Sequence, residues 1–167
     1  MNAPDKVTIR PIGPADHEAV AALVAAAFGR PDEAELVRCL RADGDAILEL
    51  GAIAGALAGH ILFSVLAVEP ATIRIAALAP VSVLPDRQNA GLGSMLIRDG
   101  LERCKALGFD VVAVLGDPAY YRRFGFTRRA ARALRSIYSG LAYQALELRD
   151  TALQDGPWSV GYPRAFD

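Results

Sequence analysis

The chain has 167 residues, of which 53% are hydrophobic and 22% are charged, and these values are typical of a packed globular domain rather than a disordered chain. Its 18 basic and 19 acidic side chains leave a formal net charge of -1, which provides no overall attraction for nucleic acid or an anionic membrane. We therefore expect one domain over residues 1–167, with a small-molecule partner.

A short strand and two helices are expected at the N-terminal end. Residues 7–10 alternate between apolar and polar side chains, as a strand does, and an alanine-rich helix follows over residues 14–29. Residues 31–40 begin with a proline and two acidic residues and have an apolar face, so they predict a second helix. Residues 1–11 lack the apolar stretch of a secretory signal, and the alanine-rich helix is too short to cross a bilayer.

The cysteine content favours a reducing compartment. The chain contains only Cys39 and Cys104, which are too few for a disulfide framework and lack the spacing of metal ligands. We therefore expect a cytoplasmic protein with no metal ion and with no membrane or nucleic-acid partner. The sequence leaves a homodimer open.

Strand-like segments dominate the middle of the chain. Residues 47–53, 57–68 and 73–84 follow one another with short turns and predict an antiparallel meander. An amphipathic helix over residues 92–107 comes next and ends at a glycine. Residues 110–115 are a valine-rich run, which is typical of a buried strand and should run parallel to the preceding strand across the helix.

The C-terminal part begins with a helix start at Asp117 and Pro118, and this short helix ends at Gly125. Residues 141–148 alternate like a final strand, and residues 151–167 have the composition of a loop. The order of elements predicts an α/β fold with a mixed, mostly antiparallel central sheet flanked by helices.

The junction between the strand over residues 73–84 and the following helix carries the clearest chemical signal. It reads Val83-Leu-Pro-Asp-Arg-Gln-Asn-Ala-Gly-Leu-Gly-Ser94, so two glycines lie where the helix begins. A helix N-terminus exposes N–H groups, glycines let a pyrophosphate approach them, and Arg87 adds a positive charge. An ordinary strand-to-helix turn has the same local pattern. A dinucleotide fingerprint needs a glycine in place of Leu96, and the P-loop sequence Gly-Lys-Ser/Thr is absent.

Two motifs, the glycine turn and a later aromatic segment, resemble those of the GNAT superfamily of acyl-CoA-dependent N-acyltransferases. The glycine turn of that family has Gln or Arg, two residues, Gly, one residue, then Gly or Ala, and Gln88, Gly91 and Gly93 match this pattern. Its later aromatic motif is similar to residues 121–126, Tyr-Arg-Arg-Phe-Gly-Phe. The resemblance covers residues 7–148.

The resemblance implies an acetyl-CoA site between two parallel strands, residues 73–84 and 110–115, that splay apart. The open edge of the first strand would pair with the pantetheine much as it would with a peptide, and its N–H groups could polarise the thioester carbonyl. The glycine turn would wrap the pyrophosphate. The implied cofactor-binding residues are Val81, Ser82, Val83, Arg87, Gln88, Asn89, Ala90, Gly91, Leu92, Gly93 and Ser94.

The resemblance also implies that Tyr121 is the general acid. A thiolate leaves when the amine attacks, and a phenol with a reference pKa of about 10 can return a proton to a thiol whose pKa is nearer 8.5. The alternative for Tyr121 is a buried aromatic residue that anchors its helix, a role that Tyr120 could equally have.

A general base is harder to identify. An amine with a pKa near 10 arrives mostly protonated and needs a group that accepts its proton. Members of the family often use an acidic residue on or near the central strands, but residues 73–84 contain none. The candidates, among which the sequence does not choose, are Glu33, Glu35, His60, Glu69 and Asp117.

Two further features concern the hold on the cofactor. Many family members have Asn seven residues before the tyrosine, where this chain has Val114, so that contact must be lost or made by the backbone. Six arginines between residues 122 and 135 form a basic stretch, and one or two of them could reach the 3'-phosphate of coenzyme A.

We therefore expect an N-acetyltransferase that passes the acetyl group of acetyl-CoA directly to a primary amine of a small molecule or peptide. The acceptor pocket is expected between residues 26–38 and residues 138–158. Two alternatives remain open, namely a non-catalytic module that binds or senses acyl-CoA, and an unrelated nucleotide-binding domain.

Overall fold

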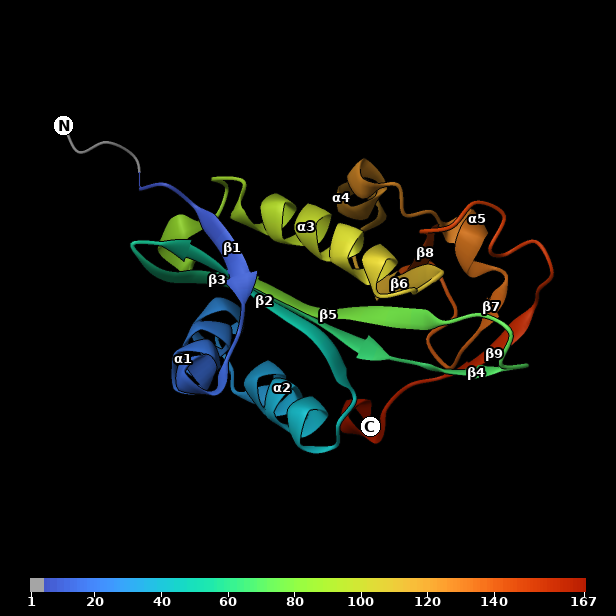
Figure 1. Ribbon diagram of the computed structural model, residues 1–167, viewed down its shortest axis with the longest axis horizontal. Coiled ribbons are helices and arrows are strands. Elements are labelled where there is room, and N and C mark those ends of the chain that lie inside the picture. Colours follow the sequence, from blue (N-terminus) through green and yellow to red (C-terminus); the bar gives the residue numbers. More distant parts are fainter. Residues whose placement is uncertain (1–4) are drawn as a thin grey trace.

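The computed structural model describes residues 5–167, so residues 1–4 of the expected domain and of the polar N-terminal segment lie outside it. A six-stranded sheet forms its centre (Figure 1). In spatial order the strands are β1 (Thr8–Pro11), β2 (Ala46–Ala54), β3 (Ala56–Val65), β5 (Ile75–Val83), β6 (Val111–Leu115) and β8 (Tyr143–Glu147). Neighbouring strands are antiparallel except for β5 and β6, which confirms the mixed, mostly antiparallel sheet.

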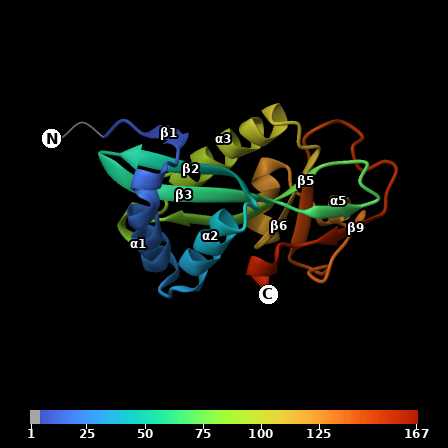
Figure 2. The same ribbon diagram turned by 60° about the horizontal axis from the view of Figure 1, so that its bottom comes forward.

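Long helices cover the two faces of this sheet (Figures 1 and 2). Helices α1 (His17–Phe28) and α2 (Asp32–Ala42) bury apolar side chains together with Leu62 of β3. Helix α3 (Leu92–Ala106) packs against Phe63 on the opposite face, so closely that a Cβ atom on Gly100 would clash with the Phe63 ring. No helix among residues 5–167 combines the length and the apolar character needed to cross a membrane.

A second, three-stranded sheet corrects two expectations. Its strands are β4 (Ala67–Glu69), β9 (Trp158–Gly161) and β7 (Leu134–Arg135), with β9 in the middle. The strand predicted over residues 57–68 is broken after Val65, because β4 leaves the central sheet to pair with β9. The segment 151–167, predicted as loop, contains β9, which pairs with partners far away in the sequence.

The small sheet is attached to the central one through a buried apolar cluster. Trp158 and Val160 of β9 are buried beside Tyr143 of β8. The Trp158 indole Nε1–H donates to Thr72 Oγ1 at 2.9 Å, so the one polar atom of this ring is satisfied. The small sheet therefore covers the half of the central sheet that α1 and α2 leave free.

Short helical turns make the remaining connections. They are η1 (Pro14–Asp16), η2 (Pro85–Arg87), α4 (Pro118–Tyr121), η3 (Arg122–Phe124), α5 (Arg128–Ala131) and η4 (Arg164–Phe166). The predicted helix at Asp117 is present, and the Asp117 side chain caps it by accepting a hydrogen bond from the backbone N–H of Ala119.

The parallel strands β5 and β6 pair over only part of their lengths. Residues Ile75 to Leu78 face Val111 to Val114, but β5 continues to Val83 whereas β6 ends at Leu115. Within the described residues, no strand pairs with residues 79–83 on the side that β6 occupies earlier. The backbone of this part of β5 is therefore an open edge inside the sheet.

Candidate functional site

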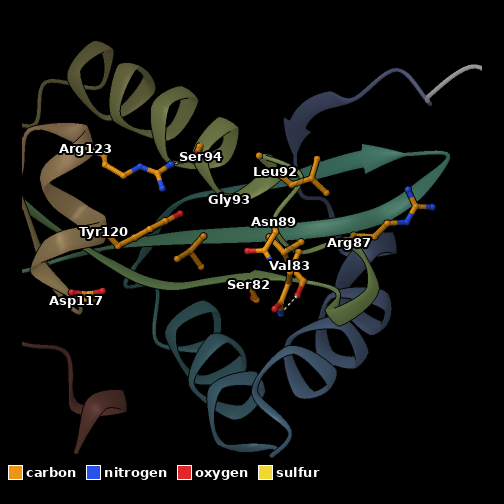
Figure 3. Close-up of a pocket in the computed structure, with 13 residues that line it drawn as sticks. Ser82, Val83, Arg87, Asn89, Leu92, Gly93, Ser94, Asp117, Tyr120 and Arg123 are labelled. Carbon is orange, nitrogen blue, oxygen red and sulfur yellow. Dashed lines mark hydrogen bonds between the residues drawn. The ribbon is translucent and has the colours of Figure 1, made fainter.

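A cavity of about 690 Å³ lies where the open edge of β5 meets the N-terminus of α3 (Figure 3). It is lined by Val81, Ser82, Val83, Arg87, Gln88, Asn89, Gly91, Leu92, Gly93, Ser94, Asp117, Tyr120 and Arg123. The structure thus brings ten of the eleven cofactor-binding residues expected from the sequence to one cavity, and Ala90 is the one that does not line it.

The glycine turn is shaped to present backbone N–H groups. Gly91 has φ +86°, a left-handed conformation that glycine adopts without strain, and α3 begins immediately after it. The first hydrogen bond of the helix is donated by the Met95 N–H to Gly91 O at 3.0 Å. The N–H groups that precede Met95 at the helix N-terminus have no acceptor within the helix. Gln88 Nε2 donates to Val83 O at 3.1 Å and ties the turn to β5. The arrangement suits an anionic ligand.

A positive side chain reaches the same helix N-terminus from the C-terminal half of the chain. Arg123 of η3 donates through Nη2 to Ser94 Oγ at 2.9 Å. Its guanidinium carbon lies 4.9 Å from the centre of the Tyr120 ring, which helps to hold it in place. Of the six arginines in the basic stretch, Arg123 lines the cavity. Its charge adds to the attraction of the helix terminus for phosphate.

The two adjacent tyrosines have different surroundings. Tyr120 lines the cavity, and its hydroxyl lies 3.2 Å from the position of a Cβ atom on Gly93. Tyr121 does not line the cavity, is 8% exposed and packs edge-on against Phe126. Its ring lies against Gly116, just beyond the end of β6. Burial raises the pKa of Tyr121 to about 12, so its phenol keeps its proton.

The five candidates for the general base do not come together. Asp117 lines the cavity but caps α4. Glu33 and Glu35 belong to α2, where Glu33 pairs with Arg30 just before the helix and Glu35 pairs with Arg38. Glu69 lies in β4 of the small sheet. His60 lies in β3, is fully buried and is hydrogen-bonded to a carboxylate.

That carboxylate, Glu49 of β2, is a residue that sequence reasoning missed. It accepts hydrogen bonds from Arg41 of α2 and interacts with Nε2 of His60 at 2.6 Å. Burial by itself raises the pKa of Glu49, but the bonds from Arg41 and His60 outweigh this and lower the pKa to about 2. A signal was present, because Glu49 is the only charged residue in the otherwise apolar segment 46–54.

Comparisons with known proteins agree with this geometry. Residues 8–129 match the family model described as an acetyltransferase (GNAT) domain. The chain belongs to the GNAT acetyltransferase family. A curated GNAT relative of Escherichia coli K12, named uncharacterized N-acetyltransferase YhbS, is 34% identical over 160 residues, which cover 92% of this chain and 95% of the relative.

Solved GNAT structures superpose on nearly the whole chain. The crystal structure of YhbS from Escherichia coli in complex with CoA has a TM-score of 0.91 at 33% identity, with 99% of this chain and 94% of that chain covered. A GNAT acetyltransferase from Brucella melitensis in complex with acetyl-CoA has a TM-score of 0.82 at 34% identity, with 98% and 99% covered. The GNAT membership expected from the two motifs is thereby confirmed.

One departure from the GNAT pattern can be placed in the fold. Val114, which stands where many members have Asn, is buried in the core between the central sheet and α3. No polar side chain is therefore available at this position of β6.

Proposed function

We propose that this protein is a cytoplasmic enzyme, built as one domain over residues 1–167, that transfers the acetyl group of acetyl-CoA directly to a primary amine of a small molecule or peptide. The observation that carries the proposal is the open edge of β5, which joins the glycine turn in one cavity. A strand edge can bind an amide-containing ligand, and a helix N-terminus can bind a pyrophosphate, so the cavity suits both halves of coenzyme A. The YhbS and Brucella melitensis relatives crystallised with CoA and acetyl-CoA support the choice of ligand.

Backbone groups of Val81, Ser82 and Val83 would pair with the pantetheine arm and polarise the thioester carbonyl. The pyrophosphate would lie on the glycine turn. The residues assigned to it are Arg87, Gln88, Asn89, Ala90, Gly91, Leu92, Gly93 and Ser94. Arg123 would hold a phosphate from the other side, because it lies beside Ser94 in the cavity.

Tyr121 would be the general acid that protonates the leaving thiolate. Its position in the aromatic motif and its place against Gly116, at the end of β6 where the parallel strands separate, support this role. A protonated phenol is what a general acid requires, and burial keeps Tyr121 in this form. Tyr120 lies beside Gly93 and would contact the cofactor near its pyrophosphate.

The test is to incubate the purified protein with acetyl-CoA and a panel of amines, including benzylamine, spermidine, an amino-acid amide and aniline, while following free thiol release. Acetylated product and thiol should appear together, and calorimetry should show binding of CoA. Tight CoA binding without transfer to any amine would support the sensing module instead. A melting temperature raised by ATP or NAD but not by CoA would support an unrelated nucleotide-binding domain.

A further inference from the structure

Three polar side chains, two of them buried and one half-buried, lie in a row across neighbouring strands of the central sheet. They are Glu49 of β2, His60 of β3 and Ser82 of β5. His60 is directly opposite Ser82 in the antiparallel pair of β3 and β5, so the two side chains share a face, with Cβ atoms about 5 Å apart. Glu49 binds Arg41 of α2, which places the row on the face that α2 covers.

The hydrogen bonds of this row leave a proton acceptor free. The Glu49 carboxylate can only accept, so the neutral His60 ring carries its proton on Nε2, 2.6 Å from Glu49 Oε1. The lone pair of the neutral ring then lies on Nδ1, and this atom has no hydrogen-bond partner among residues 5–167.

Ser82 connects the row to the cavity. Its Oγ atom is also buried without a partner in the described part of the chain, although the residue lines the cavity. Each unpaired buried polar atom costs on the order of 1–3 kcal/mol, so two of them on facing residues call for an explanation. A chain of proton transfer would use both atoms once the Ser82 hydroxyl turns to donate to Nδ1 of His60, because a hydroxyl can accept one proton while it donates another.

We propose that Ser82, His60 and Glu49 form the proton-accepting relay of acetyl transfer, in which Ser82 contacts the attacking amine and His60 takes up the proton. The proposal rests on the proposed function, because it needs an amine beside the thioester at Val81 to Val83. Ser82 is the catalytic residue of the relay, and His60 and Glu49 are positioning residues that act through it.

The amine nitrogen forms a bond to the thioester carbonyl carbon, and the C–S bond breaks with its electron pair on sulfur. One proton of the attacking nitrogen passes to Ser82 Oγ, whose own proton passes to Nδ1 of His60. The resulting imidazolium is stabilised by the Glu49 carboxylate, and the thiolate receives its proton from the general acid. His60 returns to neutral when its proton is released to solvent through Ser82.

The three side chains could instead have a purely structural role. Amines of different basicity distinguish this role from a proton relay. Benzylamine is mostly protonated at neutral pH, and the adduct that it forms with the thioester holds its proton strongly. Aniline is mostly neutral, and its adduct with the thioester gives the proton readily to water. Loss of a proton acceptor should therefore affect benzylamine far more than aniline. A disordered cavity would affect both amines alike.

The experiment compares Ser82→Ala and His60→Gln with the wild-type enzyme on both amines, with CoA affinity measured by calorimetry. We expect kcat for benzylamine to fall about 10- to 100-fold, kcat for aniline to change by less than about 2-fold, and CoA affinity to stay close to wild type. Ser64→Ala is the matched control, since Ser64 Oγ is likewise buried without a partner in residues 5–167 but does not line the cavity. It should change neither rate.

Two outcomes contradict the relay and can be told apart. Equal losses for both amines, or no loss in Ser82→Ala, would overturn the relay while leaving acetyl transfer intact. Absence of transfer by the wild-type protein to every amine in the panel would overturn the proposed function and the relay with it. Because Ser82→Ala removes a single oxygen atom, it keeps the test valid even if His60→Gln fails to fold.

Discussion

The hydroxyl of Tyr120 closes over Gly93, so that a methyl group added to this glycine would lie 3.2 Å from the Tyr120 oxygen. The same methyl group would lie 3.8 Å from Val83 Cγ2 at the end of β5. Three parts of the chain, namely the strand, the turn and α4, therefore meet around one glycine in the cavity (Figure 3). In our proposal, the free space at Gly93 is occupied by the pyrophosphate of the cofactor.

Gly93→Ala should weaken CoA binding about tenfold, which corresponds to about 1.4 kcal/mol, because the methyl group occupies space at the helix N-terminus. The melting temperature should change little, since the nearest atom is the end of the Tyr120 side chain. Isothermal titration calorimetry measures the effect. Unchanged affinity would mean that the phosphates bind elsewhere.

Tyr121→Phe should lower kcat without weakening CoA binding, whereas Tyr120→Phe should mainly weaken CoA binding. Because the pKa of Tyr121 is raised to about 12, its phenol stays protonated below that pH, and the rate should not fall near pH 10 as it would for an exposed tyrosine. Initial rates between pH 7 and about pH 11 measure this. A kcat that depends on Tyr120 instead would assign the acid to the residue that lines the cavity.

Glu49 should make the fold sensitive to acid. Its pKa is lowered from 4.5 to about 2 in the folded protein, so its contribution to stability is complete above pH 4.5 and is lost as the pH falls towards 2. The free energy of unfolding, measured with urea at several pH values, should fall by up to about 3 kcal/mol over this range. Glu49→Gln should be less stable at pH 7, because the half-buried Arg41 would lose its carboxylate partner, but should have a shallower pH dependence. An equally steep dependence in the variant would assign the effect to other carboxylates.

Gly100→Ala should destabilise the fold by about 1–3 kcal/mol, because the new methyl group would clash with the Phe63 ring. This loss exceeds the gain of up to about 1 kcal/mol that alanine brings to a helix interior. Urea unfolding measures the difference, and Phe63→Leu should reduce it in the double variant. Gly140→Ala is the control, since its Cβ atom would meet only one backbone oxygen at 4.0 Å. Equal effects at both glycines would rule out the clash as the cause.

The glycine turn and α3 could be predicted because their determinants are local. Gly91, Gly93 and the apolar face of the following helix all lie within one short segment, and short-range rules for helix starts apply to them. The parallel pairing of β5 and β6 could be predicted for the same reason, because a single helix joins the two strands.

The features that escaped prediction depend on distant partners. Strand β9 exists because β4 and β7 lie on either side of it, and its own residues have no pattern long enough to indicate a strand. Glu49 was missed because its partners Arg41 and His60 belong to a helix and to another strand. The motif could not say which of Tyr120 and Tyr121 faces the cavity, because this depends on how α4 docks against α3.

The early end of β6 leaves the sheet with a missing strand, which in our proposal the pantetheine arm replaces. Without that ligand, the backbone of residues 79–83 is a template that another extended chain could occupy. Ligand at 100 times its dissociation constant would add about 2.7 kcal/mol to the free energy of unfolding. The amount of folded protein in a cell would then depend on the supply of acetyl-CoA. The metabolite would stabilise the folded protein as well as serve as its substrate.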